Sequence, residues 1–262
     1  MAEQPLLRVD HLGVRYAASH AAALEDVSLS LMKGERLALI GESGSGKSTF
    51  ARAIAHLLPP GAARSGDITW LALEAPPEAG RDLAFVLQDP SASLDPVMTI
   101  GEQVAEGAVA HLGLSWGEAY AHAATLLARV QLPEPEHLLK AYPHQLSGGQ
   151  RQRVAIAAAL AAGPSILIAD EVTSALDRIV EAEIVALLDG LVRDEAMTLI
   201  FITHDIALAA KLADRISVFA DGRLVEDAPA AQLLARPQAE ATQRLLSAHM
   251  DLSTPSLLRE VP

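Results

Sequence analysis

Short apolar runs separated by turn residues open the chain. Residues 6–16 and 24–31 both follow this pattern, which is typical of strands in an antiparallel or mixed sheet. Residues 34–58 then change from a compact apolar strand, through a loop of Gly and Ser, into a helix-like pattern. Two further strand-like segments follow at 66–70 and 82–90. The first ninety residues therefore predict strands, with one helix placed directly after a Gly/Ser loop.

From about residue 97 to 163 the chain is dominated by Ala, Leu, Glu and Gln at helical spacing, which predicts a helical insertion. Strand-like and helix-like segments then alternate in a βαβ rhythm typical of a parallel sheet with crossover helices. The expected strands are 165–170, 197–205 and 215–227, and the expected helices are 178–194 and 206–213.

This alternation predicts an α/β fold with one core, a mixed sheet and an antiparallel β portion at the N-terminus. A helical subdomain at about 97–163 interrupts the core. The tail from about 230 indicates one short amphipathic helix and then a Pro/Ser-containing end, so we expect a C-terminal helical extension at about 230–262. All of these parts are expected to form a single domain of 262 residues.

Composition and charge exclude several classes of function. Half of the 262 residues are apolar, which favours a packed globular protein, and the net charge of -13 argues against a broad basic face for nucleic acid. The absence of cysteine excludes disulfides and thiolate metal sites. The N-terminus does not resemble a secretory signal, and the apolar run 154–162 is too short to span a bilayer. We therefore expect any membrane role to depend on a partner.

A phosphate-binding loop is predicted where the first strand-to-helix switch occurs. Residues 41–48 read GESGSGKS, which places two glycines five apart before Lys and Ser. Backbone N–H groups of such a loop surround a phosphate at a helix N-terminus, while Lys47 reaches phosphate oxygens and Ser48 ligates Mg²⁺. A flexible turn is the alternative, but the strand before and the helix after the loop favour nucleotide binding. The remaining residues assigned to this nucleotide site are Gly41, Glu42, Ser43, Gly44, Ser45, Gly46 and Thr49.

Two adjacent acids follow a later apolar strand, in the stretch ILIADEVTSALD at 166–177. Asp170 is expected to serve the Mg²⁺ that Ser48 binds, as a carboxylate at the end of a neighbouring apolar strand does in nucleoside triphosphatases with such a loop. Glu171, expected to point the other way along the strand, is then available to orient and polarise the attacking water. A helix cap is the alternative role for either acid.

A second anion-binding helix start lies about a hundred residues after the first loop. It reads LSGGQ at 146–150 and offers a hydroxyl and bare backbone N–H groups at the positive end of a long helix. A simple helix cap would leave this second phosphate-type sequence unexplained. The residues assigned to it are Ser147, Gly148, Gly149 and Gln150.

With GESGSGKST, LSGGQ, ILIADE, SALD and ITHD in this order, the chain resembles the ATPase subunit of an ABC transporter over nearly its whole length. The resemblance implies the ABC ATPase fold, ATP and Mg²⁺ as ligands, and two subunits packed head to tail around shared ATP sites. It also implies that the residues 147–150 grip the ATP of the other subunit.

Further roles follow from the resemblance, residue by residue. Tyr16 would stack on adenine, and Gln88 would sense Mg²⁺ and the γ-phosphate. Asp177 would bridge the two subunits, together with the segment that begins at Ser174. His204 would contact the γ-phosphate and hold the attacking water with Glu171. These assignments place Lys47, Gln88, Glu171 and His204 in catalysis, and Ser48, Gln88 and Asp170 around Mg²⁺.

Within the family the chain resembles the bacterial importer group for peptides and nickel, with the short nickel-type ATPases nearest in length. The segment DPSASLDP at 89–96 is the most characteristic part, and the resemblance places the coupling helix of the membrane partner there. The chain departs from the group in three places: Val172 replaces Pro, Asp227 replaces Gly, and residues 239–242 read Ala-Glu-Ala-Thr in place of His-Pro-Tyr-Thr. The last departure bears on the solute, so nickel, a metal chelate and short peptides all stay open.

The resemblance implies integral membrane permease subunits, a second ATPase subunit that is a copy or a paralogue, and an extracytoplasmic solute-binding protein. The subunit would be peripheral, on the cytoplasmic face of the inner membrane. An ABC ATPase acting on DNA or ribosomes without a membrane partner is the alternative. Such proteins usually have tandem domains or a long coiled-coil insertion, and the acidic balance also opposes nucleic acid binding.

Overall fold

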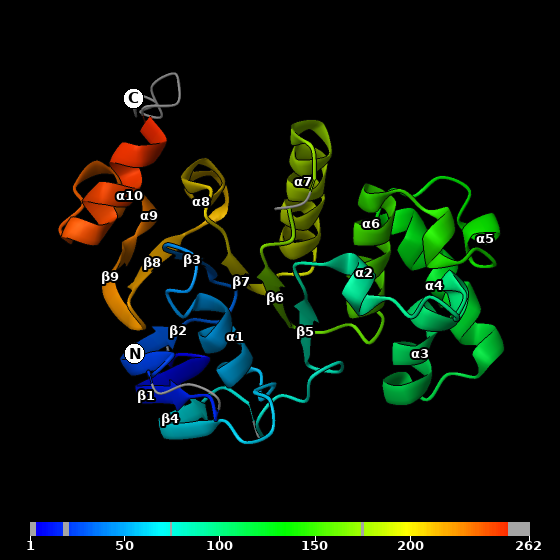
Figure 1. The fold of residues 1–262 in the computed structure, drawn as a ribbon. Coiled ribbons are helices and arrows are strands. Elements are labelled where there is room, and N and C mark those ends of the chain that lie inside the picture. The colour runs from blue at the N-terminus through cyan, green and yellow to red at the C-terminus, as the bar shows by residue number, and fades with distance from the viewer. Residues whose placement is uncertain (1–3, 18–20, 74, 174–175, 251–262) are drawn as a thin grey trace.

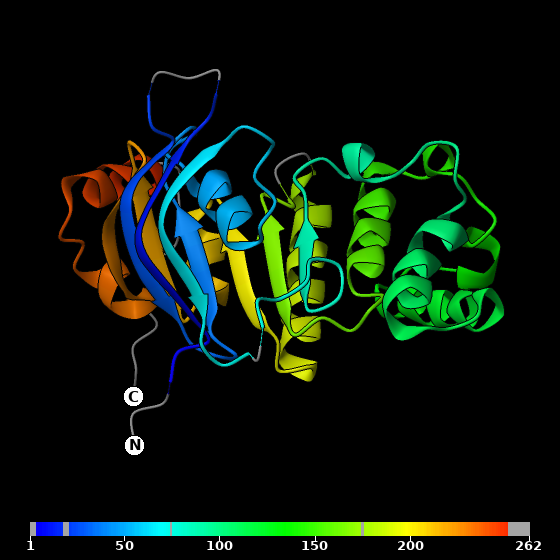
Figure 2. The ribbon, with the colours of Figure 1, turned by 90° about the horizontal axis from the view of Figure 1, so that it is seen from below.

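Two sheets form the core of the protein (Figures 1 and 2). The computed structural model describes residues 4–17, 21–73, 75–173 and 176–250. A three-stranded antiparallel sheet has the order β2-β1-β4, and a six-stranded sheet has the order β5-β6-β7-β3-β8-β9. The strands are β1 (Leu7–Arg15), β2 (Leu24–Leu31), β3 (Arg36–Ile40), β4 (Ala63–Trp70), β5 (Leu83–Val86), β6 (Ile166–Asp170), β7 (Thr198–Ile202), β8 (Arg215–Ala220) and β9 (Arg223–Pro229).

The six-stranded sheet is parallel except for β9, which pairs antiparallel with β8. Its inner strands β6 and β7 are buried at every position, so they read in the sequence as continuous apolar runs. Because β3, β6 and β7 are parallel neighbours, their carboxyl ends meet at one edge of the sheet. This edge is where an open α/β sheet places its ligand.

Helices cover both faces of this sheet. Phe50 and Ile54 of α1 (Lys47–Ile54) share a buried cluster with the three-stranded sheet. Ile184 of α7 (Arg178–Asp194) and Ile206 of α8 (Ile206–Leu212) belong to the cluster on the other face. Side chains of β6 alternate between the two clusters, as the pleat of a strand requires. The helix α1 is therefore held between the two sheets.

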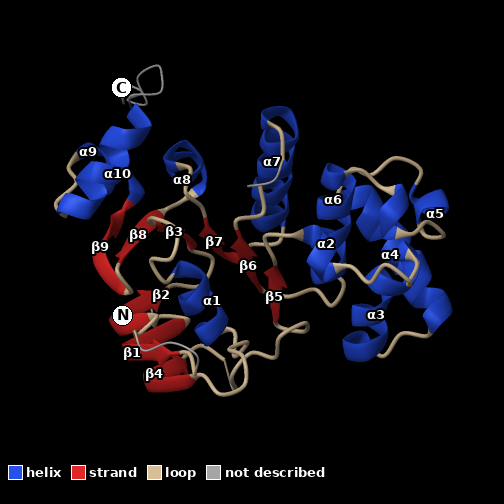
Figure 3. Ribbon diagram, in the orientation of Figure 1, coloured by secondary structure: helices blue, strands red, loops and turns tan. Residues whose placement is uncertain are grey.

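A group of helices occupies one end of the molecule, beyond β5 (Figure 3). The longer helices fall within the stretch that the sequence predicts to be helical, and three of them begin with reciprocal capping boxes, at Thr99, Ser115 and Ser147. The division of the chain into a core and a subdomain stays a prediction. The helices are α2 (Pro90–Ser93), α3 (Ile100–Leu112), α4 (Trp116–Arg129), α5 (Pro135–Leu138), the 3₁₀ turn η1 (Pro143–Gln145) and α6 (Gly148–Ala159).

Two expectations for the last fifty residues are wrong. The single strand expected at 215–227 is a hairpin, because Asp221 and Gly222 have φ values of +49° and +76° and form a two-residue turn between β8 and β9. The single helix expected after 230 is two helices, α9 (Ala230–Ala235) and α10 (Glu240–Met250), separated near Pro237. Residues 251–262 lie outside the described part. In the described ranges, no helix combines the length and apolar character that crossing a bilayer would need.

Candidate phosphate-binding and catalytic site

Residues 41–46 connect β3 to α1 at the carboxyl edge of the central sheet, and Lys47 and Ser48 begin the helix, as the sequence predicts. Two positions require glycine. A Cβ at Gly41 would lie 2.2 Å from the carbonyl oxygen of Phe219, and one at Gly46 would lie 2.8 Å from the carbonyl oxygen of Ala23. Gly46 also has φ of +105° and precedes the first turn of α1. The loop therefore needs glycine at these positions because backbone atoms lie close by, as well as because of the dihedral angles.

Lys47 is buried and folds back over the loop. Its Nζ donates to the carbonyl oxygens of Gly41 at 2.9 Å and Glu42 at 2.8 Å, and it lies 3.3 Å from Ser45 Oγ. Burial lowers the pKa of Lys47, and the negative charges of Glu171 and Asp170 oppose this shift. The ammonium group is thus held beside the loop. A phosphate bound there would stabilise the charged form of Lys47, which burial disfavours.

Ser48 and Asp170 meet across the edge of the sheet. Ser48 Oγ donates to Asp170 Oδ1 at 2.9 Å, although the two residues come from separate parts of the chain. Burial raises the pKa of Asp170, and the hydrogen bond from Ser48 acts in the opposite direction. A nearby cation stabilises the ionised form of a buried carboxylate. A bound metal ion would therefore stabilise the ionised form of Asp170.

The oxygen donors fit Mg²⁺. This ion is usually held by one or two carboxylates together with water and substrate phosphates, and Asp170 and Ser48 offer a carboxylate and a hydroxyl next to the phosphate loop. Within the described ranges, no group of three or more His, Cys, Asp or Glu residues is placed to hold a metal by itself. The phosphates of a nucleotide would have to complete the coordination.

Glu171 lies just beyond β6 and differs from the expectation in its backbone. Its φ is +46°, so it does not continue the strand and does not simply alternate with Asp170. The N–H group of Glu171 donates to the carbonyl oxygen of Ile202 at 3.1 Å, which fixes this unusual turn. Gln88 Nε2 donates to Glu171 Oε2 at 3.1 Å, so the structure brings these two predicted catalytic residues together.

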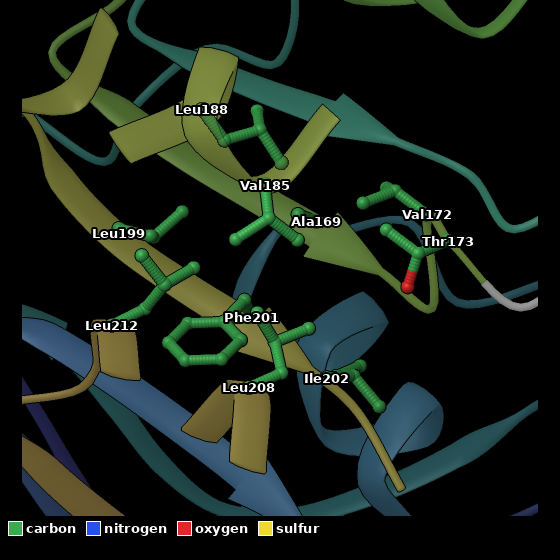
Figure 4. A pocket seen from close by; sticks show the side chains of 10 residues that line it. All are labelled: Ala169, Val172, Thr173, Val185, Leu188, Leu199, Phe201, Ile202, Leu208 and Leu212. Carbon is green, nitrogen blue, oxygen red and sulfur yellow. The ribbon is translucent and has the colours of Figure 1, made fainter. Parts of the chain in front are cut away.

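Val172, which departs from the importer group, packs into the core behind this turn. Its side chain is buried and lines a small apolar cavity of about 20 Å³ beneath the end of β6 (Figure 4). Thr173, Phe201 and Leu208 contribute to the same lining. Apolar packing therefore holds the turn after Glu171 at a position where the group commonly has proline.

The other predicted residues fall into two sets. Tyr16 lies at the phosphate loop, with its hydroxyl 3.0 Å from Thr49 Oγ1. His204 is exposed just after the carboxyl end of β7, on the edge that carries Asp170. The residues 147–150 instead lie at the start of α6, in the helical group, where Ser147 Oγ accepts from the N–H group of Gln150.

Asp177 caps α7, because its carboxylate accepts from the N–H groups of Ile179 and Val180 at 3.0 Å each. Its expected contact with a second subunit stays a prediction. Ser174, expected to face the same partner, lies outside the described part of the chain.

One contact of the phosphate loop was not predicted. The N–H group of Gly222, in the turn between β8 and β9, donates to the carbonyl oxygen of Ser45 at 3.1 Å. The dipeptide Asp221–Gly222 in the middle of a strand-like run is a known signal of a tight hairpin turn and could have revealed this turn.

Comparison with known proteins agrees with this arrangement. Residues 24–174 match the ABC transporter family. The chain is 43% identical over 275 residues to the peptidoglycan transport ATP-binding protein YejF of Agrobacterium fabrum, covering 98% of this chain and 50% of that protein. It is 40% identical over 260 residues to the glutathione import ATP-binding protein GsiA of Escherichia coli K12, covering 93% and 42%. The chain thus spans about half the length, or less, of these relatives.

Solved structures show the same fold. The ATP-binding cassette MJ0796, in a dimeric post-hydrolysis state bound to ADP and Pi, has a TM-score of 0.73 at 30% identity, covering 86% of this chain and 98% of that one. CbiO1 from Clostridium perfringens, part of the ABC transporter complex cbiONQ, has a TM-score of 0.73 at 28% identity, covering 95% and 97%. The predicted fold class, with its mixed sheet and N-terminal antiparallel portion, is confirmed.

Proposed function

Because the chain belongs to the ABC transporter family, we propose that it binds ATP with Mg²⁺ and hydrolyses the ATP to drive solute import through partner membrane subunits. The observation that carries this proposal is the cluster at the carboxyl edge of the sheet. The hydroxyl of Ser48 meets Asp170 next to the buried ammonium of Lys47, and Gln88 holds Glu171 beside them.

Each residue has a distinct task in this proposal. Lys47 exchanges its hydrogen bonds with loop carbonyls for bonds to the β- and γ-phosphates. Ser48 and Asp170 hold Mg²⁺, which, when bound, neutralises charge on the phosphates. Glu171 orients and polarises the attacking water, and Gln88 keeps its carboxylate in place. His204 is exposed at the same edge and can contact the γ-phosphate.

We propose that a second ATPase subunit, a copy or a paralogue, completes each site. Ser147, Gly148 and Gly149 begin α6 in the helical group, and Ser147 is exposed, so this helix start is available to the nucleotide of another subunit. The similar cassette MJ0796 was solved as a dimer. Tyr16 would stack on the adenine of the subunit's own ATP, from its place beside Thr49.

The solute is proposed from the relatives. They are named for transport of peptidoglycan and import of glutathione, both of which contain peptide bonds, and neither name refers to nickel. We therefore favour a short peptide or peptide conjugate over nickel, the other solute that the sequence analysis kept open. The relatives' roles also favour an importer over an ATPase that acts on nucleic acid, which the net charge of -13 already opposes.

The partners are then integral permease subunits and an extracytoplasmic solute-binding protein. The chain would sit peripherally on the cytoplasmic face of the inner membrane. The test is ATP hydrolysis by the complex reconstituted in vesicles with its permease subunits and solute-binding protein. A short peptide is expected to stimulate hydrolysis above the basal rate, and Ni²⁺ is not. Stimulation by Ni²⁺ alone would contradict the peptide assignment, and an absence of any ATP hydrolysis would contradict the function itself.

A further inference from the structure

The turn between β8 and β9 touches the phosphate loop through its backbone. The N–H group of Gly222 donates to Ser45 in the loop at 3.1 Å, and the carbonyl oxygen of Gly222 accepts from the N–H group of Glu25 in β2 at 2.8 Å. One residue of the turn is therefore bonded on one side to the phosphate loop and on the other side to the antiparallel sheet. Strand β9 lies beside β2 in the fold (Figure 1).

The junction between this turn and the phosphate loop is tightly packed, so a side chain at Gly222 would be strained. Gly222 has φ of +76°, and a Cβ there would lie 3.0 Å from the carbonyl oxygen of Ala23. On the loop side, a Cβ at Gly46 would lie 2.8 Å from the same oxygen and 3.4 Å from the Cα of Gly222. Two glycines from distant parts of the chain thus pack against one carbonyl group, and a shift of either would move the other.

The junction also reaches the proposed adenine contact. The N–H group of Ala23 donates to the carbonyl oxygen of Val14 at 2.8 Å, and Val14 lies two residues before Tyr16 at the end of β1. The connection runs from the phosphate loop through Gly222 and Ala23 to β1, the strand that ends just before Tyr16. In this way the backbone relates the phosphate-binding and base-binding parts of the site.

We propose that the β8–β9 turn is a brace that fixes the phosphate loop relative to the antiparallel sheet, and that Gly222 is a positioning residue for the nucleotide phosphates. The proposal rests on the ATP binding proposed above. Gly222 acts through Ser45, whose peptide group belongs to the loop that surrounds the phosphates.

The experiment compares two glycines of the full chain by calorimetric titration with Mg²⁺-ATP and with tripolyphosphate. Gly222→Ala is expected to raise the Kd of both by about three- to tenfold, the effect of losing one well-placed hydrogen bond. Gly34→Ala is the matched control, because Gly34 has φ of +74° and nothing within 4 Å of an added Cβ. It lies before the amino end of β3, away from the phosphate loop, and its Kd values are expected to equal those of the wild type.

The number of binding sites per chain distinguishes a displaced phosphate loop from partly unfolded protein. Partial unfolding would lower the number of sites and leave the Kd of the remaining sites unchanged, whereas a displaced loop raises the Kd at full stoichiometry. If Gly222→Ala does not fold, Gly222→Asn replaces it, since Asn tolerates positive φ while its Cβ still meets Ala23. A folded variant with the wild-type Kd would overturn the brace. A wild type that binds no ATP would instead overturn the proposed function.

Discussion

The side-chain amide of Gln88 donates a hydrogen bond to the carboxylate of Glu171, with 3.1 Å between Nε2 and Oε2. Gln88 follows β5 and Glu171 follows β6, and these two strands are parallel neighbours. The contact therefore links the segment that leads into the helical group with the acid proposed to act on water. A movement of that segment would therefore displace the hydrogen-bond donor of Glu171.

Loss of this amide should slow hydrolysis more than it weakens binding. In Gln88→Ala we expect the rate of ATP hydrolysis to fall about tenfold or more, since a hydrogen bond to a charged group contributes about 1.5–3 kcal/mol. The Kd for ATP should change little, because the phosphate loop is intact. Gln232→Ala, in an exposed position of α9, serves as the control in the same steady-state assay. Unchanged hydrolysis in Gln88→Ala would show that Glu171 does not need this partner.

The buried ammonium of Lys47 should control both binding and chemistry. Lys47→Ala is expected to abolish hydrolysis and to weaken ATP binding, because it removes the buried ammonium proposed to bind the β- and γ-phosphates. Lys33→Ala removes a lysine that is exposed in the turn after β2 and should leave both unchanged. Titration calorimetry measures the two affinities. Wild-type affinity in Lys47→Ala would exclude its role in the phosphate loop.

Asp227, which stands where the importer group commonly has glycine, should stabilise the fold. Its carboxylate accepts from Arg215 Nε at 2.7 Å and from Ser217 Oγ at 2.9 Å, and the hydrogen bond with Asp227 raises the pKa of Arg215. Asp227→Asn should lower the free energy of unfolding by about 1–3 kcal/mol, because it leaves a half-buried guanidinium with a weaker partner.

Urea unfolding measures this loss, and an exposed ion pair provides the control. Glu25 pairs with Arg223 at 2.8 Å, with more than half of each side chain accessible to solvent, so Glu25→Gln should cost no more than about 0.5 kcal/mol. Equal unfolding midpoints for Asp227→Asn and the wild type would mean that the Arg215 contact contributes nothing to stability.

The attachment of α10 should depend on pH through Glu226. Its carboxylate accepts from the N–H groups of Gln238 and Ala239 at 2.9 Å each, just before the helix begins. Burial acts to raise the pKa of Glu226, but the neighbouring hydroxyl of Thr242, followed by the N–H groups of Ala239 and Gln238, outweighs it and holds the pKa below its usual value. A lowered pKa gives stability that is present above the pKa of the unfolded chain and is lost as the pH falls through the folded-state value.

Glu226→Gln should therefore melt at a lower temperature than the wild type at pH 7, and the difference should shrink as the pH falls below about 4. Glu106→Gln, an exposed position on α3, is the matched control for loss of one negative charge. Thermal melts of the three proteins at pH 7 and pH 3 provide the measurement. A difference that stays constant across this range would contradict the proposed hydrogen-bond origin.

Most parts of the site that the sequence predicted are encoded by contiguous residues. The glycines and Lys47 of the phosphate loop lie within one short segment. The helix expected at 178–194 has those bounds because its apolar spacing begins just after Asp177, which caps its N-terminus. Asp170 could be placed beside Ser48 because parallel strands end at one edge of a sheet.

The features of the fold and the site that the sequence did not predict depend on contacts between distant segments or on single backbone angles. The positive φ of Glu171 is held by the carbonyl group of Ile202 in a neighbouring strand, which no local pattern reveals. The hairpin at Asp221 and Gly222 was hidden because the apolar residues on both sides read as one strand. The bond from Gly222 to Ser45 follows only once that hairpin is folded against the loop.

The central claim is that Asp170 and Glu171 divide the work, with the first serving the metal and the second serving the attacking water. Glu171→Gln tests this most directly, since the amide keeps the shape of the side chain and one acceptor oxygen for Gln88 but cannot act as a base. In the transporter assembled with its permease subunits, the account predicts that ATP hydrolysis falls by about a hundredfold or more while ATP binding persists. Hydrolysis at the wild-type rate in Glu171→Gln would contradict it.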